Sequence, residues 1–165
     1  MMHGFLNCLI YLALIGALSF VLGRLIPGHW YRPDQFPFKT LSFEKGGRIY
    51  DKLKIRFWQN RVPDMSRILP WAMPAKRLEK NYKERLTEMI NETCNAELIH
   101  VLLCFAGLHC IELWEGVGGV AVALLYFIGN APFILIQRYN RPRLIRLQRK
   151  QCLREEITGE VQCEF

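Results

Sequence analysis

The fold is decided by residues 116–137, which read GVGGVAVALLYFIGNAPFILIQ and are followed at once by RYNRPRL over residues 138–144. The first run contains 22 residues and no charge. At about 1.5 Å per residue, a helix of that length is about 33 Å long, enough to cross a hydrocarbon core of about 30 Å. An uncharged apolar run that ends in a cluster of cations is typical of a membrane-spanning helix.

Lysine and arginine are confined to two blocks of the chain. All 22 lie in residues 24–85 or 138–154, and none precedes Arg24. Because burying an unpaired cation in hydrocarbon is costly, a bilayer selects apolar stretches that are free of charge. The pattern therefore predicts an integral membrane protein, with a first span at residues 5–23 that we expect to be a retained anchor rather than a cleaved signal.

A second span is predicted at residues 96–114, on weaker grounds. Its apolar core, residues 98–111, is short and carries two histidines. The full range spans a bilayer if Glu97 and Glu112 lie at the interfaces, and otherwise it reads as a buried or re-entrant segment. Only a short connection separates it from residues 116–137, so the two form a predicted helical hairpin. The expected fold class is an all-α integral membrane protein with three transmembrane helices.

The topology follows from the basic residues. The segment 24–95 holds 15 of them, the tail 138–165 holds seven, and the N-terminus and the hairpin connection hold none. Because positive residues remain on the cytoplasmic side, both basic segments are expected to be cytoplasmic or interfacial and the N-terminus outside. We therefore expect a single multi-pass domain, residues 1–165, in the cell membrane.

The overall charge has a membrane explanation. A net charge of +7 and a pI near 9.3 are compatible with nucleic-acid binding. However, basic loops beside membrane spans bind anionic lipid at about 1 kcal/mol per residue. The expected partners are membrane lipids and a lipid or glycolipid substrate, not nucleic acid.

The six cysteines include no C-x-x-C pair. Several fall in expected spans or in the cytoplasmic tail, where thiols stay reduced. We expect free thiols, and we expect no metal site because the histidines lack partners at ligand spacing.

Two amphipathic helices are expected on the cytoplasmic side. Ile49, Leu53 and Phe57 recur every four residues among basic residues, which predicts a short interfacial helix. From residue 75, apolar positions recur at steps of three and four, which predicts one long helix that runs into the second span. That helix would deliver Glu97 and His100 to the membrane boundary.

Glu97 and His100 are three residues apart and therefore share a helix face. A carboxylate that orients an imidazole is the arrangement a general base needs to take a proton from a hydroxyl. The alternative is a solvated glutamate beside an interface histidine with no catalytic role.

The run after the third span is rich in anion-binding groups. Arg138, Arg141 and Arg143 could pair with phosphate or carboxylate, and Asn140 is placed to cap a following helix whose N-terminus also attracts anions. The alternative is a simple cationic anchor. Within the span, Asn130 and Pro132 predict a kink that is either structural or lines a cavity.

Several stretches resemble a small bacterial membrane family, the glycosyl-4,4'-diaponeurosporenoate acyltransferases of staphyloxanthin-type carotenoid synthesis. The similar stretches run in order over most of the chain: Arg24–Pro27, Phe43–Gly47, Trp58, Pro63-Asp64, Glu92-Thr93, Ala96–His100, Asn130–Pro132 and Gln137–Leu144. The most specific of them are Ala96–His100 and Gln137–Leu144.

The resemblance implies a membrane acyltransferase that moves a fatty acyl chain onto a hydroxyl of a glycolipid such as a glycosylated carotenoid. No bound cofactor is expected, and the acyl donor would be a phosphopantetheine thioester, either acyl-CoA or acyl carrier protein. His100 would be the base, with Glu97 holding its tautomer. The substrate-binding candidates are Trp58, Arg61, Asn130, Arg138, Asn140, Arg141 and Arg143.

Other readings remain open. A non-catalytic lipid-binding or assembly subunit would use Glu97 and His100 for hydrogen bonds between helices. Another lipid-modifying enzyme would carry out acyl exchange or hydrolysis. An acyl-enzyme route through Cys94 is an alternative to base catalysis. Three helices form only a thin wall around a site for two lipids, which favours a homo-oligomer.

Overall fold

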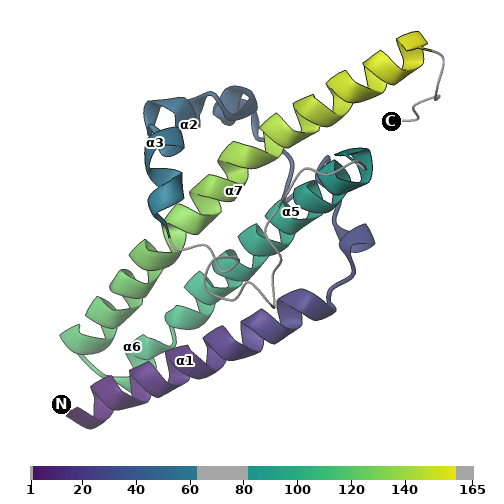
Figure 1. The fold of residues 1–165 in the computed structure, drawn as a ribbon. Helices are drawn as coiled ribbons and strands as arrows, with labels where there is room; N and C mark the ends of the chain where they lie inside the picture. Colours follow the sequence, from purple (N-terminus) through teal and green to yellow (C-terminus); the bar gives the residue numbers. More distant parts are fainter. Residues whose placement is uncertain (1, 63–81, 159–165) are drawn as a thin grey trace.

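The computed structural model describes residues 2–62 and 82–158, and these contain helices but no strand. Three helices are long: α1 (Met2–Leu25), α5 (Tyr82–Gly107) and α7 (Val117–Thr158) (Figure 1). The short elements are η1 (Gly28–Trp30), η2 (Ser42–Gly47), α2 (Ile49–Lys52), α3 (Ile55–Trp58), η3 (Gln59–Arg61) and α6 (Cys110–Leu113).

Three helical stretches are long and apolar enough to cross a membrane: Met2–Leu25, Arg85–Leu113 and Val117–Ile157. This confirms the predicted all-α integral membrane protein with three spans. The second stretch is longer than residues 96–114, because α5 begins well before the apolar core and α6 continues after a short turn. Its 29 residues are long and apolar enough to cross a bilayer, although the apolar core within it is short. The part of the expected long helix between residues 75 and 81 lies outside the described residues.

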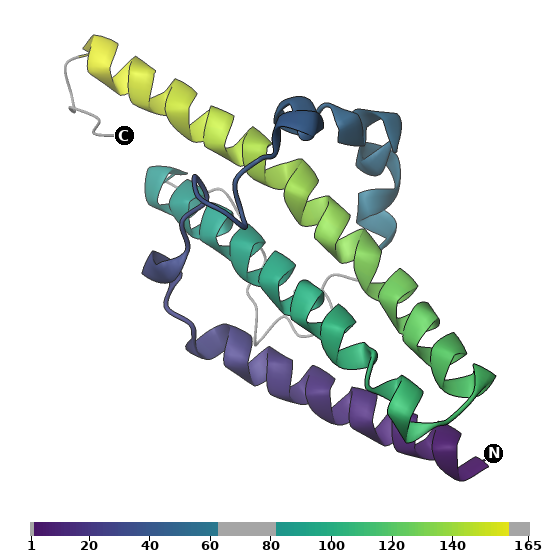
Figure 2. The ribbon, with the colours of Figure 1, turned by 180° about the vertical axis from the view of Figure 1, so that it is seen from behind.

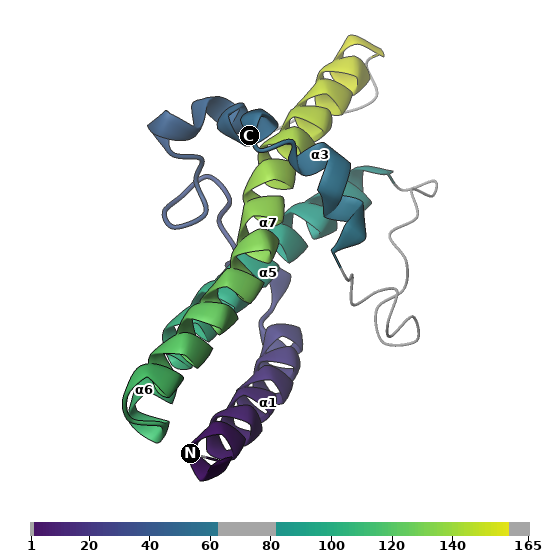
Figure 3. The same cartoon turned by 90° about the vertical axis from the view of Figure 1, so that its left-hand side faces the viewer.

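The long helices pack side by side with α5 in the middle. Figures 1 and 2 show α1 on one side of α5 and α7 on the other, with α2 and α3 beyond α7. The α5–α7 pair has the most extensive packing. Figure 3 shows that α7 continues well past the end of α1. With 42 residues, α7 is about 63 Å long, roughly twice the hydrocarbon thickness.

The hairpin between α6 and α7 depends on glycine at close approaches. A Cβ on Gly119 would lie 2.2 Å from the carbonyl oxygen of Trp114, and one on Gly118 would lie 2.3 Å from the Trp114 ring. Gly116 has φ +88°, a left-handed conformation that favours glycine. These residues let the second and third spans turn within a few residues, as the sequence predicts.

Helix α7 runs without a break through Pro132 and Pro142. The predicted helix start at Asn140 is therefore wrong, because Asn140 lies inside α7. The kink expected at Pro132 stays a prediction. Prolines are tolerated in membrane helices when neighbouring groups support the backbone. Of the arginines that flank the second proline, Arg141 is tied to α5 and Arg143 to α2, as described below.

The predicted short amphipathic helix forms as two single turns, α2 and α3. Lys54, with φ +51°, separates them in a left-handed conformation. Tyr50 and Ile55 pack against Tyr139 of α7 and are buried. The predicted apolar stripe faces away from the protein, and its members Ile49, Leu53 and Phe57 are 37%, 50% and 76% exposed. Packing on α7 uses another face of these turns and leaves the stripe on the outside, where an interfacial helix would meet lipid.

The cysteines among the described residues divide into two groups, and Cys163 lies outside those residues. Cys8, Cys94, Cys104 and Cys110 are free and buried, as expected. Cys152 is disulfide-bonded, so the expectation of free thiols is wrong for that residue.

Candidate functional site

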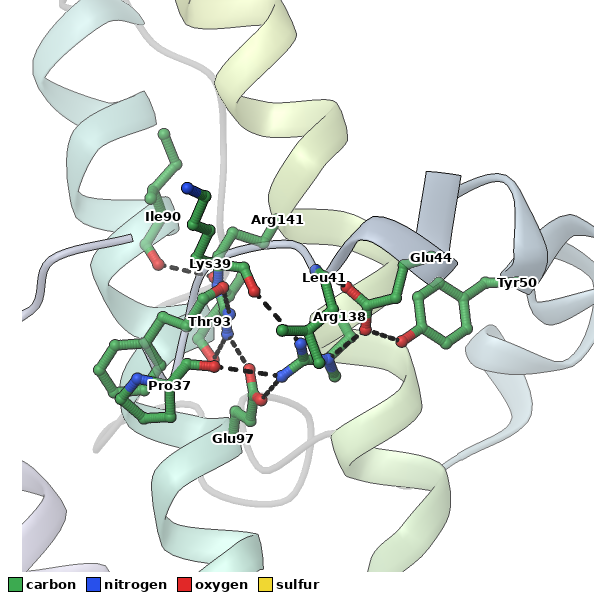
Figure 4. A network of polar contacts seen from close by, with 11 residues as sticks. Pro37, Lys39, Leu41, Glu44, Tyr50, Ile90, Thr93, Glu97, Arg138 and Arg141 are labelled. Atoms are coloured by element: carbon green, nitrogen blue, oxygen red, sulfur yellow. Dashed lines mark hydrogen bonds and ion pairs between the residues drawn. The ribbon is translucent and has the colours of Figure 1, made fainter. Parts of the chain in front are cut away.

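Arg138 is the centre of a polar network at the end of the third predicted span (Figure 4). Its Nε donates to Glu44 Oε1 at 2.6 Å, and its Nη1 donates to Glu97 Oε1. The carbonyl oxygens of Pro37 and Lys39 lie 3.4 Å from its two terminal nitrogens. One guanidinium therefore joins α7, α5 and the irregular segment between the first two spans.

Arg141 lies one helical turn further along α7 and is 2% exposed. Its Nη2 donates to Glu97 Oε2 and to the Thr93 carbonyl at 2.9 Å, while its Nε donates to Thr93 Oγ1 at 3.0 Å. Its Nη1 donates to the Phe38 carbonyl at 2.8 Å. Almost every donor of this arginine is used inside the protein.

Glu44, Glu97, Arg138 and Arg141 form what we call the charged cluster. Two carboxylates meet two guanidiniums, so its formal charge is zero. Glu44 is 1% exposed and Glu97 is 5% exposed, and charges so buried need paired and hydrogen-bonded partners. The arginines converge as predicted, but they bind the protein's own carboxylates rather than leaving an open anion site.

Glu44 begins the EKGG stretch, residues 44–47, which forms a tight turn against α7. Lys45, Gly46 and Gly47 all have positive φ, and a Cβ on Gly47 would lie 2.9 Å from the Pro142 ring. Glu44 Oε2 also accepts from the Leu41 backbone N–H at 2.8 Å, which fixes the carboxylate towards α7.

The pKa values of this segment reflect the same contacts. Burial acts to raise the pKa of Glu44, but hydrogen bonds from Arg138, Tyr50 and Leu41 outweigh it and hold the pKa below its ordinary value. Burial and the neighbouring Glu44 carboxylate raise the pKa of Tyr50 to about 12. At neutral pH the site therefore holds an ionised Glu44 and a neutral Tyr50 that donates to it.

A small surface depression lies over the charged cluster. It is lined by Phe38, Thr40, Glu44, Arg138, Arg141 and Pro142. The Arg138 side chain is 15% exposed, so its guanidinium is the more accessible cation of the cluster. The depression is one place on the described surface where the cluster comes close to solvent.

His100 has a different partner from the predicted one. Its Nδ1 lies 2.8 Å from Asn130 Oδ1 on α7, and its ring stacks on Phe133 with a centroid distance of 4.5 Å. Glu97 shares a helix face with His100, as predicted, but both its oxygens bind arginines. The proposed orienting role of Glu97 is therefore wrong, because guanidiniums attract a carboxylate more strongly than a neutral imidazole does.

The remaining predicted residues lie around this centre. Arg143 donates to Asp51 at 2.7 Å and lies 3.5 Å from the centroid of the Tyr139 ring, so it ties α2 to α7. Trp58 packs against the Tyr50, Ile55 and Tyr139 group. Arg61 is exposed in η3 and makes none of the cluster's hydrogen bonds described above.

Sequence reasoning missed three contributors, Glu44, Tyr50 and Thr93. Glu44 and Thr93 lie 94 and 48 residues from the arginines they bind, so no helical periodicity relates them. The signal that existed was their place in the stretches Phe43–Gly47 and Glu92-Thr93, which share the family resemblance. Asn130 was singled out, but not as the partner of a histidine.

The fold and the site define an α-helical integral membrane protein whose central helix pair carries a buried charged cluster next to a histidine. The family model described as glycosyl-4,4'-diaponeurosporenoate acyltransferase matches residues 27–150. The chain belongs to this family, and it is accordingly an acyltransferase.

The curated relatives agree with the family match. The glycosyl-4,4'-diaponeurosporenoate acyltransferases of Staphylococcus aureus strains RF122 / ET3-1 and USA300 are each 33% identical over 131 residues, which is 78% of this chain and 78% of each relative. No solved structure matches the chain.

Proposed function

We propose that the protein transfers a fatty acyl chain from a phosphopantetheine thioester to a hydroxyl of a glycosylated membrane lipid, such as a glycosylated carotenoid. The family and the names of the S. aureus relatives support the acceptor class. Three spans support an acceptor and an acyl chain that both reside in the bilayer. The donor's polar end would arrive from the side that carries the charged cluster.

The observation that carries the proposed chemistry is the position of His100. It lies on α5 about 4.5 Å along the axis from Glu97, between the charged cluster and the apolar interior. Its Nδ1 is engaged by Asn130, which leaves Nε2 as the nitrogen for chemistry. Placing an ionisable side chain at such a depth in the membrane costs free energy, which makes His100 a functional candidate.

In the proposed reaction, Nε2 of His100 removes the proton from the acceptor hydroxyl. The hydroxyl oxygen then bonds to the thioester carbonyl carbon, the carbon–sulfur bond breaks, and the leaving thiolate takes the proton back from the imidazolium. The products are an ester and a free thiol. Cys94 is fully buried, which favours this direct route over an acyl-cysteine intermediate.

The arginines have an indirect part in this proposal. Because Arg141 is buried and almost all its N–H groups donate to protein oxygens, it holds α7 to α5 and to the segment around Phe38. Arg138 faces the depression, where a donor phosphate would lie beside its guanidinium. The charged cluster would thus orient the donor without using Glu97 as a catalytic group.

We also propose that the protein lies in the cell membrane with its N-terminus outside and its basic segments in the cytoplasm. In a variant without other cysteines, Glu115→Cys in the hairpin connection should react with an impermeant maleimide on intact cells. Lys52→Cys in α2 should react only after permeabilisation. Both positions are exposed in the folded chain. The reverse labelling pattern would refute this orientation.

The proposed reaction is tested by mass spectrometry of lipids from a host that makes a glycosylated carotenoid. The wild type should produce a new fatty acyl ester, and His100→Ala should lower its amount by about 10²–10⁴-fold, the usual contribution of a general base. His109→Ala is the matched control, because His109 is half-exposed and pairs with Glu112. Unchanged ester with His100→Ala would refute the base, and absence of ester with wild type would refute the acceptor class.

A further inference from the structure

Asn130 uses both ends of its side chain to connect His100 to the backbone of α7. The residue is 8% exposed. Its Oδ1 lies 2.8 Å from His100 Nδ1, and its Nδ2 donates to the Tyr126 carbonyl at 2.8 Å. The two contacts point in different directions and fix the amide in one orientation.

The chemistry of these groups settles which ring nitrogen carries the proton. A backbone carbonyl can only accept a hydrogen bond, so the NH₂ end of Asn130 must face Tyr126. The Oδ1 end, which also only accepts, must then face His100. Nδ1 of His100 is therefore the donor, and in a neutral imidazole Nε2 keeps its lone pair.

We propose that Asn130 is the positioning residue that fixes His100 as the Nδ1–H tautomer and so makes Nε2 the base. This inference rests on the proposed acyl transfer for its functional meaning. Phe133, one turn after Asn130 on α7, stacks on the imidazole with an interplanar angle of 10° and fixes the ring plane. One helix thus holds both the edge and the face of the ring.

A neutral partner suits this location better than a carboxylate. Asn130 selects the tautomer without adding a negative charge beside the ring, and an unpaired charge is costly in an apolar setting. The charged groups nearest along the two helices, Glu97 and Arg138, are paired with each other. By helix spacing, the other titratable side chains nearest this pair are Cys104, one turn after His100 on α5, and Tyr126, one turn before Asn130 on α7.

The direct test is nitrogen NMR of protein labelled with ¹⁵N-histidine, with the His100 signals assigned by comparison with His100→Ala. The wild type should show His100 protonated at Nδ1. Asn130→Ala should show a mixture of tautomers or the Nε2–H form. A wild-type His100 protonated at Nε2 would overturn the proposal, and this result does not depend on how the Asn130 variants fold.

The kinetic test separates positioning from a structural role. Asn130→Ala should lower turnover about 10-fold or more, as loss of an orienting partner does elsewhere. Asn130→Asp supplies an acceptor for Nδ1–H and should recover part of that loss. Its carboxylate stabilises the imidazolium, so the acidic limb of the pH–rate profile should move to higher pH.

Asn95→Ala is the matched control, because Asn95 also joins elements through both ends of its amide, to Gly23 and Tyr31. It should lower stability without moving the pH–rate profile or the His100 tautomer. If Asn130→Ala changes neither the pH–rate profile nor the His100 tautomer, the positioning role fails while the proposed reaction stands. If His100→Ala keeps full activity, the proposed base fails, whereas the NMR result still judges the tautomer.

Discussion

Replacing Glu97 by glutamine tests whether the charged cluster holds the molecule together. Glu97 is 5% exposed and accepts from both Arg138 and Arg141, of which Arg141 is 2% exposed. Glutamine keeps the size and one acceptor oxygen, but it removes the charge that balances two guanidiniums. The change therefore leaves one buried cation uncompensated.

The expected loss can be worked from these contacts. A hydrogen bond to a charged group contributes about 1.5–3 kcal/mol, and breaking a buried ion pair from one side costs about 3–5 kcal/mol. Because glutamine can retain one of the two bonds, we expect Glu97→Gln to lower the free energy of unfolding by about 3 kcal/mol. Asp51→Asn should lower it by less than about 1 kcal/mol, because that carboxylate is 57% exposed and its Arg143 partner 29% exposed.

The assay is thermal unfolding of the purified protein in detergent, with wild type and the two variants under the same conditions. The melting temperature should fall several-fold further for Glu97→Gln than for Asp51→Asn. Equal small shifts for both variants would show that the cluster does not stabilise the fold. The His100 tautomer should be the same in Glu97→Gln as in wild type, since Asn130 sets it.

Three other parts of the molecule give measurable expectations. The pKa of Glu44 is lowered from 4.5, so the ionised Glu44 stabilises the fold above that pH, and this stabilisation is lost as the pH falls through the lowered pKa. Glu44→Gln should remove this acid dependence of the melting temperature. The pKa of Tyr50 is raised from 10.0 to about 12, so the neutral Tyr50 stabilises the fold below pH 10, and this stabilisation is lost as the pH rises through about 12. In an absorbance titration of the tyrosines, Tyr50→Phe should remove a phenolate step near pH 12. Gly119→Ala would place a Cβ 2.2 Å from the Trp114 carbonyl oxygen and should destabilise the hairpin by about 1–3 kcal/mol, as judged by thermal unfolding. Gly129→Ala, which meets nothing within 4 Å, should be neutral or stabilising by about 0.5–1 kcal/mol, and equal losses in the two variants would contradict the packing at the hairpin.

The three spans and the hairpin were predictable because they follow from one-dimensional patterns. A run of uncharged residues has a length, and a helix converts that length into a distance across the bilayer. The tight connection at Gly116 was likewise visible as a short gap between two apolar runs. The convergence of Glu97 with Arg138 at one end of the helix pair also followed, because antiparallel neighbours bring those positions to the same level.

The pairing inside the site was not predictable from the same patterns. The i, i+3 relation correctly put Glu97 and His100 on one face, but it could not rank an imidazole against two guanidiniums supplied by another helix. Nor could it show that Asn130 would face His100 across 30 residues. Periodicity fixes which face a residue occupies, whereas the partner depends on how two faces come together.

The ion pairs of Glu97 also bear on how the chain enters the membrane. Arg138 follows Glu97 by 41 residues, so during synthesis α5 is exposed first with a carboxylate and an imidazole that have no compensating partner. A charged side chain costs about 2.5–3.5 kcal/mol at the centre of an inserting helix, and Glu97, near the boundary, carries part of that cost. Helix α7, which follows after a turn of a few residues, brings both the strongly apolar span and the arginines that neutralise Glu97. Insertion of α5 and α7 as a single unit is then favoured over insertion one after the other, and a nascent chain halted before residue 138 would leave α5 at the membrane surface.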